Sequence, residues 1–131
     1  QIAVIRRLVA YIGSHVEIVP CPVVREADGV ALSSRNKLLN PEERAIAPHI
    51  ARALMESIDY AKTHTVAETH DHVVSTINAI DGLEVEYFQI LDGNTLLDVQ
   101  DWQDSDYVVG CITVYCGKTP IRLIDHIKYK E

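Results

Sequence analysis

The sequence has few cysteines, no excess of basic residues and no long apolar run. Its 12 Lys and Arg residues are outnumbered by 19 Asp and Glu residues, for a formal net charge of −7. The basic surface that is typical of nucleic-acid-binding proteins is therefore missing. The most apolar stretch, residues 107–115, is far shorter than the ~20 residues that a membrane helix needs, and no basic, apolar leader is present. These absences predict a cytoplasmic protein that binds neither nucleic acid nor membrane.

The cysteines also exclude two kinds of stabilising framework. Cys21, Cys111 and Cys116 are odd in number and lie in apolar sequence. We therefore expect buried free thiols in a reducing compartment and no disulfide framework. The C-x-x-C spacing of a structural zinc site does not occur, and no metal-binding residues are expected.

The first 23 residues have the pattern of an α/β unit. Residues 2–12 carry apolar side chains at helical spacing, and Gly13 follows as a stop signal. Residues 15–19 then alternate as a strand does. A short helix that leads into a strand is typical of the last unit of an α/β sheet.

Two further helices are expected in the middle of the chain. Asn40 precedes Pro41, and a glutamate at the third helical position can complete a capping box, so a helix is predicted from residue 41 to about 62. Pro48 lies inside this helix and should bend it, because proline removes one helical hydrogen bond. A second helix is predicted over residues 66–80, with Thr65 as its cap.

The rest of the chain changes to strand periodicity. Strands are predicted over residues 83–92, 107–116 and 119–127, and the second is apolar on both faces, as in a central strand. Trp102 and Tyr107 are expected to pack the long connection between the first two strands. The prediction is an α+β fold with helices packed on a small three-stranded antiparallel sheet.

One segment has the composition of a phosphate-binding loop. Residues 25–36 read R-E-A-D-G-V-A-L-S-S-R-N, so Ser33, Ser34 and Arg35 follow a turn that contains glycine. A guanidinium can bind phosphate oxygens in pairs, and hydroxyl and backbone N–H groups add neutral donors. The alternative is that a serine only caps a turn while Arg35 pairs with a surface acid.

The longer string resembles the pantothenate synthetase (pantoate–beta-alanine ligase) family. The similarity continues through L-x-P-E-E-R and through R-L-I-D-H-I after a G-K-T-P turn. It also includes the opening residues, Q-I-A-V-I-R-R-L-V. The resemblance implies that residues 1–23 are the end of a Rossmann-like nucleotide-binding domain that is otherwise missing. Residues 24–131 would form the C-terminal lid domain.

The resemblance also implies an activity. In this family ATP adenylates the carboxylate of (R)-pantoate, and the amine of beta-alanine then displaces AMP from the pantoyl adenylate. Mg²⁺ accompanies the triphosphate, and its ligands are not expected in this chain. The family's dimer contacts come from the missing domain, so the full-length enzyme is expected to be a homodimer.

Individual residues are carried over by position. Ser33, Ser34 and Arg35, with Leu32 before them, match the family's phosphate-binding loop, and Val24 matches a position whose backbone meets adenine. Gln1 matches the second glutamine of a pair that binds pantoate.

The family's histidine motif and its lysine are absent from this chain. We therefore expect a fragment that is inactive alone, with no certain catalytic residue. The competing hypothesis is a stand-alone α+β binding or interaction module without catalysis.

Three other groups of polar residues have simpler interpretations. A histidine-rich cluster in residues 64–72, comprising His64, Glu68, His70 and His72, is expected to be solvated and incidental. The aspartates of residues 98–106 lack the glycine and the final glutamate of a calcium loop. His126 is expected on the surface or on an edge strand.

Overall fold

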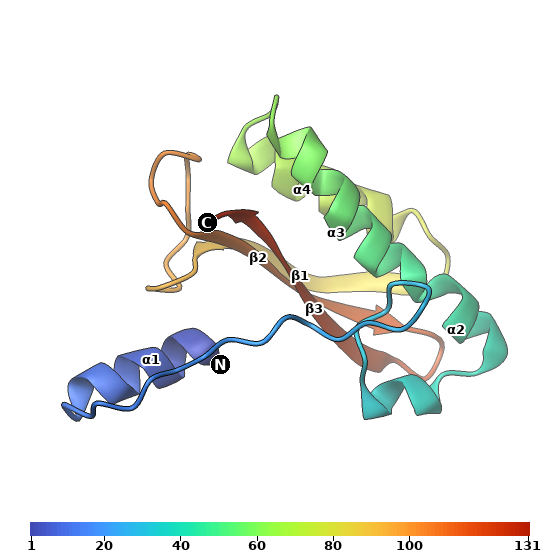
Figure 1. Ribbon diagram of the computed structural model, residues 1–131. Coiled ribbons are helices and arrows are strands. Elements are labelled where there is room, and N and C mark those ends of the chain that lie inside the picture. The colour runs from blue at the N-terminus through green and yellow to red at the C-terminus, as the bar shows by residue number, and fades with distance from the viewer.

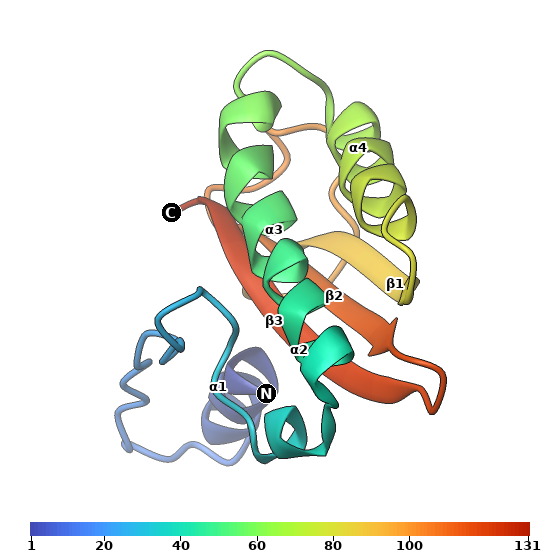
Figure 2. The same cartoon turned by 90° about the vertical axis from the view of Figure 1, so that its right-hand side faces the viewer.

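The computed structural model describes all residues, 1–131. Four α-helices, one 3₁₀ helix and three strands follow one another along the chain: α1 (Ile2–Tyr11), η1 (Ser34–Leu38), α2 (Pro41–Ile46), α3 (Pro48–Ala61), α4 (Val66–Asn78), β1 (Leu83–Asp92), β2 (Val108–Cys116) and β3 (Ile121–Lys130). Helices α3 and α4 lie side by side on one face of the sheet, and α1 lies apart from them beyond the other face (Figures 1 and 2). The predicted α+β fold is confirmed. No helix is long and apolar enough to cross a membrane.

The helix starts follow the capping signals in the sequence. Asn40 and Glu43 form a complete capping box, with both hydrogen bonds at 2.9 Å, and Thr65 and Glu68 form a second. The single bent helix predicted from residue 41 is wrong, because α2 ends at Ile46 and Pro48 starts a new helix. A proline is better tolerated in the first turn of a helix than in its interior, because the N–H groups of the first turn have no hydrogen-bond partner within the helix.

The sheet is an antiparallel meander in the order β1-β2-β3, so β2 is the central strand, as predicted. Val108, Ile112, Val114 and Cys116 on β2 point to the helices and are fully buried or nearly so. Leu54 of α3 and Ile77 of α4 cover them in one core cluster. Strand β3 continues to Lys130, three residues beyond its predicted end.

The first 24 residues differ most from the prediction. Helix α1 forms as expected, but the strand predicted over residues 15–19 does not form, and residues 14–24 are irregular. The reason is that a strand needs a hydrogen-bonded neighbour, and these residues have none in the structure. Cys21 is exposed, not buried, because it lies in this segment, whereas Cys111 is half-buried and Cys116 is buried.

The prediction of a solvated histidine cluster holds for Glu68, which is exposed, but not for the three histidines. His64 and His72 stack on the two faces of Tyr60, with ring centroids 3.6 and 4.1 Å away. The Nε2 atom of His70 lies 3.0 Å from the Phe88 carbonyl oxygen. These side chains are half-buried and serve packing.

Trp102 in the long connection and His126 follow the predictions. Trp102 packs as expected and donates from its indole nitrogen to the His64 carbonyl at 2.8 Å. His126 is exposed on β3, an edge strand.

Candidate active site

A tight hairpin leads into the candidate phosphate loop. The Leu32 N–H donates to the Val24 carbonyl at 2.9 Å, and the Glu26 N–H donates to the Val30 carbonyl at 2.8 Å. Gly29 makes the turn possible, since its φ of +93° lies in a backbone region that residues with a side chain rarely adopt. The hairpin therefore brings two of the expected site residues, Val24 and Leu32, side by side at its open end.

The predicted serines and arginine follow directly. Ser33 is the N-cap of η1, and its Oγ accepts a hydrogen bond from the Arg35 N–H at 3.2 Å. The Ser33 hydroxyl proton is thus still free to be donated, and the Ser34 hydroxyl makes no hydrogen bond. One part of the alternative from the sequence is correct: a serine does cap a turn here.

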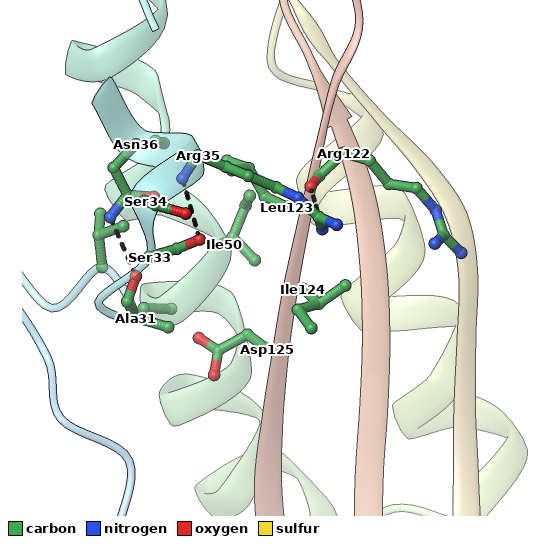
Figure 3. Close-up of a pocket in the computed structure, with 13 residues that line it drawn as sticks. Ala31, Ser33, Ser34, Arg35, Asn36, Ile50, Arg122, Leu123, Ile124 and Asp125 are labelled. Atoms are coloured by element: carbon green, nitrogen blue, oxygen red, sulfur yellow. Dashed lines mark hydrogen bonds between the residues drawn. The ribbon is translucent and has the colours of Figure 1, made fainter. Parts of the chain in front are cut away.

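Ser33, Ser34 and Arg35 line a cavity of about 300 Å³ between η1, helix α3 and strand β3 (Figure 3). Ile50 and Ala51 of α3 form an apolar wall, and residues 122–125 of β3 form the opposite wall. Figure 3 shows the Arg35 side chain extending from η1 toward β3. The cavity therefore combines an apolar wall from α3 with hydrogen-bond donors from Ser33, Ser34 and Arg35.

Arg35 carries an unneutralised charge at this cavity. Its Nη1 donates to the Arg122 carbonyl at 3.1 Å, and it forms no ion pair. Arg122 pairs instead with Glu86, Nε to Oε2 at 2.6 Å. The other part of the alternative, a surface acid paired with Arg35, is therefore wrong, and most of the Arg35 donors are available for an anion.

An acid at the cavity wall is neutralised by a half-buried arginine. Asp125 of β3 is 5% exposed and accepts two hydrogen bonds from the Arg25 guanidinium, at 2.6 and 2.9 Å. Arg25 is 19% exposed and also donates to the Gly29 carbonyl at 3.0 Å. Asp125 therefore adds little negative charge to the cavity, and the pair joins the hairpin to the sheet.

The structure does not bring every predicted site residue together. Val24 and Leu32 are mostly exposed and lie outside the lining of the cavity. Gln1 is the exposed N-cap of α1, without a side-chain capping bond, and does not line the cavity either. Five predicted nucleotide contacts thus occupy one continuous segment, whereas Gln1 is separate.

Sequence reasoning missed the β3 wall and the pairing of Arg25 with Asp125. Both residues lie in the strings that carry the family resemblance, but 100 positions apart. The opposite charges of Arg25 and Asp125 were the signal available in the sequence. Only the fold shows that the two side chains meet.

These features define an α+β domain whose cavity is suited to an anionic group of a small molecule. The pantoate–beta-alanine ligase family model matches residues 1–128. Pantothenate synthetases of Porphyromonas gingivalis and Bacteroides thetaiotaomicron are both 54% identical over 131 residues, which is all of this chain and 46% of each relative. That of Clostridium botulinum is 36% identical over 132 residues, covering 99% of this chain and 46% of the relative.

A solved structure supports the same relationship. The crystal structure of pantothenate synthetase from Thermus thermophilus matches with a TM-score of 0.87 and 35% identity, over 99% of this chain and 46% of that one. The chain belongs to the pantoate–beta-alanine ligase family. It spans about half the length of the curated relatives it matches, 46% in the cases above.

Proposed function

We propose that this chain is the C-terminal portion of an ATP-dependent ligase that condenses (R)-pantoate with beta-alanine through a pantoyl adenylate. The products would be pantothenate, AMP and pyrophosphate. In this proposal Ser33, Ser34 and Arg35 bind the ATP phosphates. The observation that carries it is the unpaired Arg35, beside two serine hydroxyls that are free to donate, at the mouth of the cavity.

The chemistry of adenylation explains why such a group is needed. The pantoate carboxylate attacks the α-phosphorus, and negative charge moves onto the departing pyrophosphate. An arginine with free donors stabilises this charge best where it is held in place beforehand. Val24 and Leu32, at the open end of the hairpin, would meet the nucleotide beyond the cavity.

This chain supplies only part of such an active site. We propose that residues 1–23 end a Rossmann-like nucleotide-binding domain and that residues 24–131 act as a lid over ATP. Gln1, which belongs to residues 1–23, would bind pantoate. The dimer contacts would come from the nucleotide-binding domain, and the enzyme would be cytoplasmic.

A magnesium ion would enter with the triphosphate. The chain has no cluster of three side chains suited to hold it, so its residues do not fit a resident metal site. We therefore assign no step in this chain to the ion.

The test is Arg35→Ala in the full-length protein that contains this chain. The specificity constant for ATP should fall roughly 10- to 100-fold, because hydrogen bonds to a charged group contribute about 1.5–3 kcal/mol. The assay is AMP release dependent on pantoate and beta-alanine. Lys37→Ala is the matched control, since Lys37 is an exposed cation on the same short helix outside the cavity lining. Equal effects of the two substitutions would remove Arg35 from the site.

A second experiment addresses the competing hypothesis of a stand-alone module. The 131-residue chain alone should show no AMP release, because the family's histidine motif and lysine are not among its residues. Turnover by this chain would contradict the proposal. So would a gene whose start codon directly precedes Gln1.

A further inference from the structure

We infer that Glu26 and Arg44 are positioning residues for the phosphate loop: they hold Ser33, Ser34 and Arg35 in place through the buried amide of Asn36, without reaching the nucleotide. This inference rests on the proposed function for its substrate, ATP. Arg44 lies on α2 and does not line the cavity, and neither does Glu26.

The buried side chain within η1 itself is polar. Asn36 is the one buried residue of η1, 8% exposed, and the other four residues of the helix are exposed. Leu38, the one large apolar side chain of η1, is itself exposed. Within η1, Asn36 is therefore the residue that fixes the helix, while Leu39, the C-cap that follows it, packs against the core.

Both amide protons of Asn36 are used, and both partners are acceptors. Nδ2 donates to Glu26 Oε1 at 2.7 Å and to the Ala31 carbonyl at 3.1 Å, and the second of these bonds is visible in Figure 3. A carboxylate and a carbonyl cannot donate, so the orientation of the amide is fixed. The Asn36 Oδ1 atom is buried and has no hydrogen-bond partner. The Asn36 side chain thus depends entirely on the two acceptors that face Nδ2.

Arg44 in turn fixes Glu26. Its Nη2 donates to Glu26 Oε2 at 2.8 Å, and its Nη1 bonds Asp28 Oδ2 at 2.6 Å. One guanidinium therefore holds two acids of the hairpin, and Glu26 uses one oxygen for Arg44 and the other for Asn36. Helix α2 is in this way linked through Glu26 to the residue that directly follows Arg35.

The positive charge of Arg44 stabilises the ionised forms of Glu26 and Asp28. Hydrogen bonds from Asn36 and Arg44 lower the pKa of Glu26, and the bond from Arg44 lowers the pKa of Asp28. Both acids are therefore ionised at neutral pH, and Arg44 balances part of their charge. Without Arg44 the carboxylates of Glu26 and Asp28 would repel each other, and Glu26 would be held less firmly against Asn36.

The experiment compares Arg44→Met, Arg44→Lys, Glu26→Gln and the Arg44→Met/Glu26→Gln double variant in the full-length protein. Arg44→Met should raise the KM for ATP roughly 3- to 10-fold, less than loss of a direct charged contact, and leave the KM values for pantoate and beta-alanine unchanged. Arg44→Lys should restore part of the ATP affinity. The double variant should be no worse than Arg44→Met, because residues of one network do not act additively.

A second readout does not depend on turnover. The Asn36 N–H donates to the Ser33 carbonyl at 3.1 Å, and the Leu39 N–H donates to the Asn36 carbonyl at 3.3 Å. Hydrogen exchange at these two amides should accelerate in Arg44→Met and not in Lys62→Met. Lys62 is the control because it pairs with Asp59 near the end of α3, away from the cavity lining.

The outcomes separate the two proposals. The positioning role is wrong if Arg44→Met lowers the melting temperature but leaves both the KM for ATP and the two exchange rates unchanged, or if Lys62→Met has equal effects. If Arg44→Met fails to fold, Arg44→Lys and Glu26→Gln provide the same comparison. Absence of ligase activity in the unsubstituted full-length protein would instead refute the proposed function, and the exchange rates would still decide whether Arg44 holds the loop.

Discussion

Substitution of Asp125 by alanine tests whether the hairpin is held to the sheet by the largely buried Arg25–Asp125 ion pair. The change removes a carboxylate that is 5% exposed and leaves the Arg25 guanidinium, 19% exposed, without its partner. Breaking a buried pair from one side costs about 3–5 kcal/mol. We expect the lower end, about 3 kcal/mol, because Arg25 keeps the Gly29 carbonyl as an acceptor at 3.0 Å.

The assay is urea unfolding followed by the fluorescence of Trp102, the one tryptophan of the chain. With an m-value of about 1.5 kcal/mol/M, a loss of about 3 kcal/mol lowers the midpoint by about 2 M. The Arg25→Met/Asp125→Leu double variant should recover most of this stability, since an apolar pair of similar volume needs no partner.

The control is Lys128→Met, which removes an exposed pair with Glu131 whose side chains are 46% and 71% exposed. Such pairs contribute about 0–1 kcal/mol. If Asp125→Ala cost no more than Lys128→Met, the Arg25–Asp125 pair would not be the attachment that its burial indicates. A double variant as unstable as Asp125→Ala would equally refute the reasoning.

Further predictions concern a turn glycine, an acid with a lowered pKa and the exposed cysteine. Gly117→Ala should destabilise the fold by about 2 kcal/mol in thermal unfolding, because Gly117 has a φ of +89° and a Cβ there would collide with the Glu43 carboxylate of the α2 cap. Gly13→Ala is the control and should cost less, because Gly13 has a φ of +64° but open space around it. Hydrogen bonds from Ser105, Thr95 and Asn94 lower the pKa of Asp92 to about 2, so its contribution to stability is present above pH 3.8 and lost as the pH falls toward 2. Asp92→Asn should remove that part of the acid sensitivity in a pH titration of Trp102 fluorescence. A thiol-reactive disulfide reagent at pH 8 should label one cysteine rapidly, and Cys21→Ser should abolish this phase, because burial raises the pKa of Cys111 and raises that of Cys116 to about 11.

Local signals predicted most of the regular structure. The cap at Asn40 and the cap at Thr65 placed two helix starts correctly, since a capping box involves only four consecutive positions. The pattern of residues 107–116, apolar on both faces, correctly predicted a central strand. The strand predicted over residues 15–19 failed for the opposite reason: its formation depends on neighbouring strands, which no pattern within those residues can supply.

For the candidate site too, the sequence predicted the local part and not the contacts between distant segments. Ser33, Ser34 and Arg35 could be found because one continuous segment carries them. The wall formed by residues 122–125 could not, since Arg35 and the Arg122 carbonyl that it contacts are 87 positions apart. Arg44 lay in a recognised string, but its bonds to Glu26 and Asp28 depend on how α2 packs beside the hairpin.

The separation of Arg25 from Asp125 has a consequence for folding kinetics. The pair closes a loop of 100 positions, whereas β1, β2 and β3 pair only with strands adjacent in the chain. Contacts distant in sequence cost more chain entropy to form, so the meander should assemble before the hairpin docks on it. Asp125→Ala should then accelerate unfolding and leave the folding rate nearly unchanged. The cavity that we assign to the nucleotide would be among the last parts of the molecule to form and the first to open.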